Sequence, residues 1–511
     1  MGILKQMQTR QAARRLAMGV SLTLCAGAWA MMPQVTEAAA APAAATAANE
    51  LSKLNDAQNA LLEQEKQIAQ RQQAHQEAAV KGAKSGHITV PVSSLVVKSY
   101  PGMSKDMILR VIPEAQKAVV DVHQLSKEIQ FINDAGAMKI GANFSKENAG
   151  YLLTLTAEKV QEMHTTVSLS NTGNDYTGNW RLTTSYTDRN LTHQADTLGV
   201  AYVTSPAAGH LSDVKQGAVA YRLPLGHDTD ALTLMTSYSD VDLGSVDHEV
   251  TPFGPFDATA SGKGFTAGLH YQHNMAYTSR EKDGVDFGVN YWNMKNSYGY
   301  LLNNKPLDAP ETRYDVSTVA LSFFHNDRDA AHSLSYQAGI ETNLGNVGGD
   351  YRDSAYKYNR NFQIYHAGAG YNYRTPSDWI FAVRGEGQYS NNNLVPALQV
   401  GAGGRTSVRG FTERAIAADK GVTGSLEIYT PKFATGSRFL VFLDAAKLSN
   451  NEQAGTLFDD KGIASWGVGY RYMEPTGRAT LSIDYADPIK DVPDSWQQQH
   501  KRWNMQMSMN F

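Results

Sequence analysis

From His164 to the C-terminus, the chain is built from segments of about ten residues in which apolar and polar side chains alternate. Examples of these segments are DTLGVAYVT, QGAVAYRLPL, VDFGVNYWNM, RFLVFLDAA and ATLSIDYAD. Because a period of two residues puts alternate side chains on opposite faces, each segment predicts a β-strand with one apolar and one polar face. We count about sixteen segments, each as long as a tilted strand that crosses a bilayer.

The gaps between these segments are alternately short and long. Short gaps lie at 224–230, 325–331, 374–377 and 473–476, and long gaps lie at 240–262, 294–312, 343–360 and 390–421. Short turns on one side and long loops on the other are typical of outer-membrane barrels, and the aromatic last residue, Phe511, suits their closing strand. The alternatives are a soluble β-sandwich and a propeller, although the sequence shows no fixed internal repeat. We therefore predict a mainly β chain with an antiparallel transmembrane β-barrel of about sixteen strands over residues 161–511.

The composition agrees with a membrane barrel. Charged residues make up 19% of the 511 residues, below the roughly 25% usual for soluble domains, whereas Tyr (25) and Gly (43) are abundant. The net charge of −4 gives no basis for a nucleic-acid partner. The only cysteine, Cys25, lies in the N-terminal apolar run, which excludes a disulfide framework and cysteine-based metal sites.

Residues 1–40 are expected to form an export signal. A positively charged start precedes an uncharged, largely apolar run at 16–32, and small residues up to Ala40 suit cleavage. The less favoured alternative is a retained anchor, since about 20 residues are needed to span a bilayer. No later run is apolar for that length, so a membrane location requires a barrel, in which every backbone polar group is paired.

Residues 41–86 are expected to hold a flexible leader, a polar helix and a linker. The segment 50–80 is rich in Ala, Gln, Glu and Leu, all good helix formers, and its thin apolar stripe fades after Ile68. A helix of this polarity is not driven into a core. It is interpreted as either a coiled-coil stub or a helix that sits in a watery channel.

Residues 87–160 are predicted to form a small α+β domain. A strand (HITVPVSSLVV) is followed by a helix that Ser104 can cap and by a second helix that Gly136 can end. Two further strands complete the order β-α-α-β-β, which predicts a small sheet backed by two helices.

The segment GGRTSVRGFTERA, at 403–415, puts glycines and arginines in the long gap between the eleventh and twelfth predicted strands. Its tetrad VRGF resembles the VRGY/F motif of the POTRA-barrel transporters of the outer membrane. The four residues that match this lumen-loop motif are Val408, Arg409, Gly410 and Phe411.

The segment FLDAA resembles the F-x-D-x-G strand motif of the same transporters. Phe442 and Asp444 match that motif, and Ala446 stands where glycine is usual. DKGVTGSLEIYTP, SWGVGYRY and LSIDYADPI also resemble strands of this superfamily.

The N-terminal half of the mature chain narrows the resemblance to one branch. The α+β unit resembles a POTRA domain, a periplasmic module that binds extended polypeptide, and the polar helix resembles a plug helix. The chain is thus identified as a member of the two-partner secretion transporters (TpsB, of the ShlB/FhaC/HecB type). Members of this branch usually have two POTRA domains, and this chain has room for one.

A loop inside a barrel must find a partner for its arginine, because an unpaired buried charge is very costly. Strand alternation puts Asp444 on the same face as Phe442 and on the opposite face from Leu443. We hypothesise that Arg409 reaches into the lumen and pairs with Asp444. The alternative is an exposed loop, in which Arg409 needs no partner.

The neighbours of Arg409 have expected roles in the same arrangement. Gly410 lets the backbone pack closely, Phe411 wedges the tip, and Glu427 on a neighbouring strand is a second possible acceptor. If this pairing anchors the loop, alanine at Arg409 or at Asp444 will impair transport or barrel stability.

The resemblance implies that the protein is a polypeptide transporter in the outer membrane of a diderm bacterium, with its POTRA domain in the periplasm. Its expected partners are an unfolded, secreted TpsA-like exoprotein, outer-membrane lipid and the barrel assembly machinery. The alternatives are an insertase that helps other barrels into the membrane and a passive pore.

No enzymatic, metal or cofactor site is expected. The histidines lack H-E-x-x-H or other close ligand spacing, and GAGGR at 401–405 lacks the lysine of a phosphate-binding loop. The serines lie in no G-x-S-x-G context, so a hydrolase has no supporting motif.

Overall fold

The structure, a computed structural model, covers an α+β domain and a β-barrel. It describes residues 88–147, 150–225, 229–251, 254–302, 305–307, 311–345, 348–349, 359, 361–451, 461–490 and 500–511. The predicted export signal and the predicted polar helix lie outside the described residues. None of the described helices has the length and apolarity to cross a membrane.

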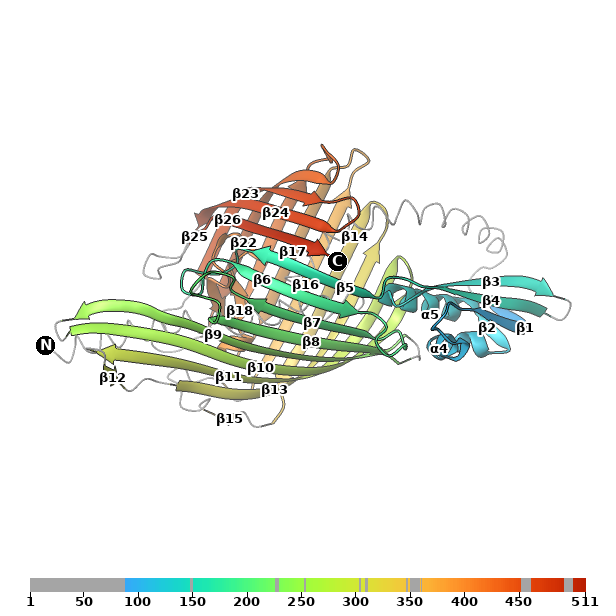
Figure 1. Cartoon of the computed structure of the whole chain (residues 1–511), viewed down its shortest axis with the longest axis horizontal. Coiled ribbons are helices and arrows are strands. Elements are labelled where there is room, and N and C mark those ends of the chain that lie inside the picture. Colours follow the sequence, from blue (N-terminus) through green and yellow to red (C-terminus); the bar gives the residue numbers. More distant parts are fainter. Residues whose placement is uncertain are drawn as a thin grey trace.

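Sixteen antiparallel strands form the wall of a closed barrel, which confirms the predicted fold class (Figure 1). These strands are β5 (Met163–Ser170), β6 (Arg181–Asp188), β7 (Thr197–Thr204), β8 (Val214–Pro224), β9 (Ala231–Thr251), β10 (Gly254–Tyr277), β11 (Glu281–Leu302), β13 (Glu311–Arg328), β14 (His332–Asn343), β16 (Gln363–Arg374), β17 (Ile380–Tyr389), β21 (Lys420–Tyr429), β22 (Ser437–Ser449), β23 (Lys461–Met473), β24 (Ala479–Lys490) and β26 (Trp503–Asn510). Two short strands belong to the same sheet: β12 (Lys305–Leu307) pairs with β11, and β15 (Gly348–Gly349) pairs with β13. The last strand, β26, pairs with the first, β5, and thereby closes the sheet.

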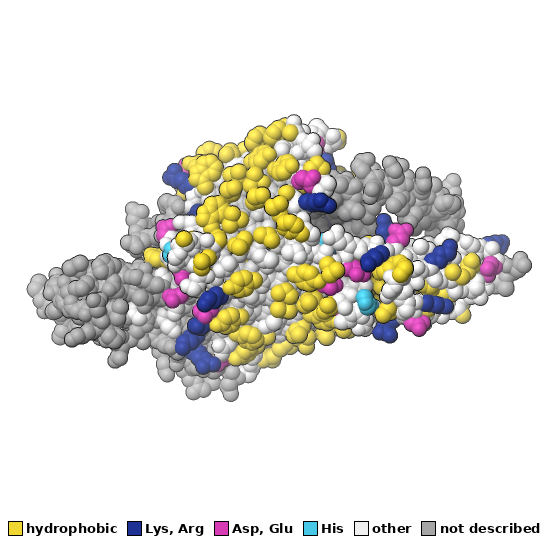
Figure 2. Space-filling model, in the orientation of Figure 1, with side chains coloured by type: hydrophobic (Ala, Val, Ile, Leu, Met, Phe, Trp, Pro, Cys, Tyr) yellow, Lys and Arg dark blue, Asp and Glu magenta, His cyan; other side chains and the backbone are white. Residues whose placement is uncertain are grey.

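Side chains alternate between the lumen and the outside along each wall strand. On β22, Phe439, Val441 and Leu443 are about half exposed, whereas Phe442 and Asp444 are buried on the lumen side. Exposed aliphatic and aromatic side chains continue on the outer face of the other strands, where Figure 2 shows them spread over the barrel surface. An outward apolar band of this kind is what a lipid environment requires of a barrel.

Two of the predicted long loops are in fact strands. Residues 240–251 and 254–262 form the paired ends of β9 and β10. Residues 294–302 and 311–312 form the ends of β11 and β13, and residues 305–307 form β12. The prediction was wrong because these segments are polar and carry glycine and proline. Their β conformation comes from continuous pairing with neighbouring strands, which intrinsic propensity does not report. In Figure 1 these strands reach beyond the rest of the wall.

The gap between β17 and β21 is a folded loop, as predicted. It contains a 3₁₀ turn, η2 (Pro396–Leu398), and three short strands, β18 (Val400–Ala402), β19 (Gly410–Phe411) and β20 (Ile416–Ala418). Strands β18 and β20 pair with each other, and β19 pairs with β25 (His500–Lys501), which precedes the last wall strand. The loop therefore has its own hydrogen-bonded structure.

The N-terminal described residues form the predicted α+β domain. Its elements are β1 (Thr89–Lys98), α4 (Lys105–Val111), η1 (Pro113–Gln116), β2 (Val119–Asp121), α5 (Val122–Ala135), β3 (Lys139–Glu147) and β4 (Gly150–Glu158). They give the predicted order with one extra short strand, and the sheet order is β2-β1-β4-β3. Strand β3 consequently lies at an edge of the sheet.

Local sequence determines where the two helices begin and end. The Ser104 side chain accepts a hydrogen bond from the backbone N–H of Met107 and so caps α4. Asp121 caps α5 in the same way, and Gly136 ends that helix in the left-handed region, at φ +69°. The caps satisfy backbone groups that the first and last turns leave unpaired.

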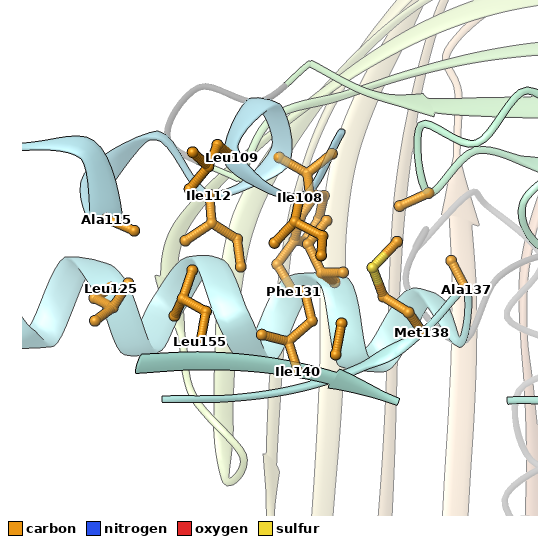
Figure 3. Packing of buried hydrophobic residues seen from close by; sticks show 14 of the residues in the cluster. Ile108, Leu109, Ile112, Ala115, Leu125, Phe131, Ala137, Met138, Ile140 and Leu155 are labelled. Carbon is orange, nitrogen blue, oxygen red and sulfur yellow. The ribbon is translucent and has the colours of Figure 1, made fainter. Parts of the chain in front are cut away.

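One apolar core joins the α+β domain to the barrel. Side chains of α4, α5 and the sheet point toward one another in this core (Figure 3). The same cluster includes Tyr277 at the end of β10, whose ring meets that of Phe131 edge-on at 5.3 Å. Polar contacts reinforce the junction: Lys127 Nζ donates to the Asn274 carbonyl oxygen at 2.7 Å. The domain is therefore packed against the barrel end that carries the short turns.

Helix α5 also buries a carboxyl group that is neutral over part of the physiological pH range. Glu128 accepts hydrogen bonds from the Glu114 backbone N–H and from the Gln124 side chain. Burial, together with the nearby negative charge of Glu114, raises the pKa of Glu128 to about 7. Because the folded-state pKa exceeds the ordinary value, this group stabilises the domain at low pH, and its contribution is lost as the pH rises through about 7.

We expect the α+β domain to lose about 1–2 kcal/mol of stability between pH 5.5 and 8.5 through ionisation of Glu128. The measurement is hydrogen–deuterium exchange of α5 in the full-length protein across this range. In Glu128→Gln the pH dependence should largely disappear, because glutamine keeps an acceptor and cannot ionise. An equally steep pH dependence in this variant would exclude Glu128 as its source.

Candidate functional site

The tip of the β17–β21 loop is buried inside the barrel. Val408 and Phe411 have no exposed surface, and Arg409 is 2% exposed. Gly410 and Phe411 form β19, which is held by its pairing with β25. The structure therefore brings the four VRGF residues together with the lumen face of strands β21 to β24.

The Arg409 guanidinium forms a forked ion pair with Asp444 on β22. Its Nε donates to Asp444 Oδ2 at 2.7 Å, and its Nη2 donates to Oδ1 at 2.9 Å. The backbone N–H of Arg409 also donates to Oδ2, at 3.1 Å. Ser425 Oγ donates to Asp444 Oδ1 at 2.6 Å, so the carboxylate is held from two sides. Planar two-point pairing of this kind is among the stronger charge-assisted contacts in proteins.

Two further carboxylates lie around the same guanidinium. Arg409 Nη2 lies 2.7 Å from Glu427 Oε1, and Arg409 Nη1 lies 3.9 Å from Asp484 Oδ1. Tyr429 donates to the other oxygen of Glu427 at 2.7 Å, and Arg471 pairs with Asp484 at 2.7 and 3.0 Å. We call these residues the lumen ion cluster; its charged members are Arg409, Arg471, Glu427, Asp444 and Asp484.

The ring of Phe442 covers the guanidinium of Arg409. The Arg409 Cζ atom lies 3.4 Å from the ring centroid, a distance at which the π face attracts the cation. The ring fits because Gly467 stands opposite Phe442 on β23: a Cβ atom at this glycine would lie 2.3 Å from Phe442 Cζ. Gly469 likewise leaves room for Asp484, whose Oδ1 would be 2.2 Å from a Cβ there.

Because the lumen ion cluster is buried, its stability depends on each of its charged members. Charges removed from water cost several kcal/mol each, and close opposite charges with good hydrogen bonds offset that cost. Removing one partner from a buried pair costs about 3–5 kcal/mol, because it leaves the other charge uncompensated. The cluster therefore fixes the position of the loop more than it adds to the overall free energy of folding.

Apolar contacts hold the loop tip on the other side of Arg409. Val408 and Phe411 pack in a buried cluster with Ala446, Leu448 and Ile463 from the barrel wall. Ala446 stands where the F-x-D-x-G motif of the family has glycine. It is 7% exposed and contributes its methyl group to this cluster.

Gly410 lies where the loop backbone approaches the wall. Its φ is +93°, and a Cβ atom there would lie 3.3 Å from Ala486 Cβ. Both the backbone conformation and the close approach favour glycine at this position.

Several residues of the cluster were missed in the sequence. Asp484, Arg471, Tyr429 and Ser425 lie in segments that resemble strands of the family, but none of them was assigned a role beside Arg409. A signal for some of them exists: strand alternation puts Glu427 and Ser425 on one face of β21, and Arg471 and Gly469 on one face of β23. Alternation does not give the relative positions of those faces, since they depend on the strand register.

The fold and this anchored loop define an outer-membrane barrel with an internal loop, and comparison with known proteins gives the family. The family model "Haemolysin secretion/activation protein ShlB/FhaC/HecB" matches residues 152–472, more than half of the chain. The chain belongs to this family. Its localisation is the outer membrane.

Individual relatives are distant. The heme/hemopexin transporter protein HuxB of Haemophilus influenzae is 22% identical over 382 residues, which cover 72% of this chain and 64% of HuxB. The chain thus spans less than two thirds of the length of this relative. A second HuxB sequence from Haemophilus influenzae is 23% identical, over 69% of this chain and 58% of its own length.

Solved structures share the fold. CdiB from Escherichia coli has a TM-score of 0.67 at 15% identity, covering 82% of this chain and 77% of CdiB. CdiB from Acinetobacter baumannii has a TM-score of 0.62 at 17% identity, covering 82% and 74%.

Arg409→Lys tests whether charge alone holds the loop. Lysine keeps the positive charge but cannot reach Asp444 and Glu427 with one planar fork, so we expect a loss of about 2 kcal/mol in barrel stability. The measurement is the urea midpoint of the folded band in heat-modifiability gels, with the protein in lipid vesicles. A wild-type midpoint would show that the forked geometry is dispensable.

Gly410→Ala should destabilise the barrel through two effects, positive φ and contact with Ala486. Gly209→Ala is the matched control, since Gly209 has φ +87° but a Cβ atom added there would meet no other atom within 4 Å. We expect both variants to lose about 1 kcal/mol through backbone strain, and Gly410→Ala to lose at least about 1 kcal/mol more. Equal losses in thermal melts would argue against close packing of Gly410 on the wall.

Proposed function

We propose that this protein takes an unfolded exoprotein from the periplasm and passes it through the barrel to the cell surface. The observation that carries the proposal is the VRGF loop, anchored inside the lumen by the lumen ion cluster. A loop held at this place narrows the lumen and fixes its lining, which a passive pore for small solutes does not need. Family membership supports the same function.

The α+β domain offers a surface for an extended substrate. Strand β3 is an edge strand of nine residues, and most of its residues are exposed. An extended polypeptide can pair with such an edge through main-chain hydrogen bonds, largely independent of its sequence. The domain is packed against the short-turn end of the barrel, and β3 starts near this end and reaches away from it (Figure 1). A chain bound along β3 would therefore lead toward the barrel.

The proposed transport is not an enzymatic reaction. The sequence shows no phosphate-binding motif, so nucleotide hydrolysis by this chain is not part of the proposal. Folding of the exoprotein outside the cell would instead drive transport outward. Besides the exoprotein, the proposed partners are outer-membrane lipid at the apolar band and the assembly machinery that inserts the barrel itself.

Secretion should depend on Arg409. A deletion strain is complemented with wild type, with Arg409→Ala or with Arg502→Ala, an arginine whose pair with Asp487 is exposed. We expect one or two large proteins to be missing from the supernatant of the deletion strain. Wild type and Arg502→Ala should restore them, and Arg409→Ala should not. The measurement is quantitative proteomics of supernatant and outer membrane.

Other outcomes of that comparison would identify other functions. Depletion of many outer-membrane barrels with normal secretion would indicate an insertase. If the protein content of both the supernatant and the outer membrane is unchanged, a passive pore is the remaining function, and the secretion proposal is withdrawn. The level of folded Arg409→Ala in the membrane separates a transport defect from lost assembly.

Substrate capture at β3 has its own test. A photo-crosslinking amino acid at Asn143 or Ser145 should trap the exoprotein in the periplasm, whereas one at Lys105, exposed on α4, should not. Crosslinks of equal yield from Lys105 would contradict capture at the β3 edge.

A further inference from the structure

Three potential metal ligands meet at the short-turn end of the barrel, away from the lumen. Glu281 and Asp283 lie on β11, and His325 lies on the neighbouring strand β13. One ligand atom from each residue lies within 4.8 Å of the other two. In the part of the chain that the structure describes, this is the only group of three such residues so arranged.

The site is built on paired strands. Asp283 and His325 are direct cross-strand partners, and Glu281 stands two residues along β11, on the same face as Asp283. This face is the outer one, because alternation continues from Asp283 to the exposed Phe287. Strand backbones hold ligands more closely than loops do, which favours a defined geometry.

The His325 ring is already oriented toward the carboxylate of Asp283. Its Nδ1 lies 2.5 Å from Asp283 Oδ1. Its ring stacks on Tyr336 of the next strand, with centroids 4.6 Å apart and planes at 24°. The His325 side chain is only 15% exposed and that of Asp283 is 21% exposed, so both have limited freedom to turn away.

We propose that Glu281, Asp283 and His325 bind a divalent first-row metal ion, Zn²⁺ being the best fit. An imidazole nitrogen and carboxylate oxygens are established zinc ligands at about 2.0–2.2 Å, and three protein ligands leave one position for water. In a four-coordinate site of this size the ligand atoms lie roughly 3–3.5 Å apart, so small side-chain rotations from the present spacing suffice. The metal would lie between His325 and Asp283, which face each other directly in this structure.

The neighbouring charged residues pair with one another and not with the three proposed ligands. Asp327, which faces Glu281 across the strands, is engaged by Arg280 at 2.8 Å. Lys282 points to the other face and pairs with Asp134 of α5 at 2.6 Å. Residue spacing alone does not reveal the site, because Asp283 and His325 are 42 positions apart and only the strand register joins them.

The test uses tag-free, full-length protein in detergent, freed of metal and titrated with Zn²⁺ against a fluorescent zinc chelator. We expect one ion per chain, bound with micromolar affinity. His325→Ala and Asp283→Asn should each weaken binding roughly tenfold or more.

The matched control is His332→Ala, since His332 is an exposed histidine whose Nδ1 faces the Tyr371 hydroxyl and not a carboxylate. It should bind Zn²⁺ as wild type does. Glu281→Gln covers the case in which His325→Ala fails to fold, because Glu281 is exposed and its loss disturbs no packing. The proposal is overturned if wild type binds no zinc, or if His332→Ala weakens binding as much as the variants of the three ligands.

Discussion

A buried arginine that must be neutralised determines how the loop and the barrel wall fit together. Arg409 is 2% exposed and lies inside a membrane barrel, so without partners its charge would cost several kcal/mol. Asp444 and Glu427 supply the compensating charge at 2.7 Å each, and Phe442 covers the guanidinium face. These partners come from β21 and β22. The register of these two strands therefore determines the position of the loop tip.

The wall strands are adapted to this demand. Gly467 and Gly469 on β23 leave the space that Phe442 and Asp484 fill, and a side chain at either glycine would collide with them. Arg471 balances the extra carboxylate of Asp484. The apolar residues on the lipid face thus allow insertion into the membrane. The polar and small residues on the lumen face hold the internal loop in place.

Much of this was predictable because a period of two residues is a strong signal. The alternation in RFLVFLDAA put Asp444 on the same face as Phe442, and the resemblance of VRGF and FLDAA to motifs of the family suggested that Arg409 pairs with Asp444. The extension of β9 and β10 was not predictable, since their polar, glycine-containing ends become strands by pairing with each other. Asp484 and the group around His325 escaped for a related reason: each depends on strand register, which the spacing of residues along one strand does not contain.

A double-mutant cycle between Arg409→Met and Asp444→Asn tests the central claim most directly. The free energy of unfolding is measured for the two single variants, the double variant and wild type, with the barrel refolded in lipid vesicles and denatured with urea. A lumen-anchored ion pair predicts that the double variant is more stable than additivity allows, with a coupling energy of about 2 kcal/mol or more. Additive effects, within about 0.5 kcal/mol, would show that Arg409 and Asp444 do not act together and would contradict the account.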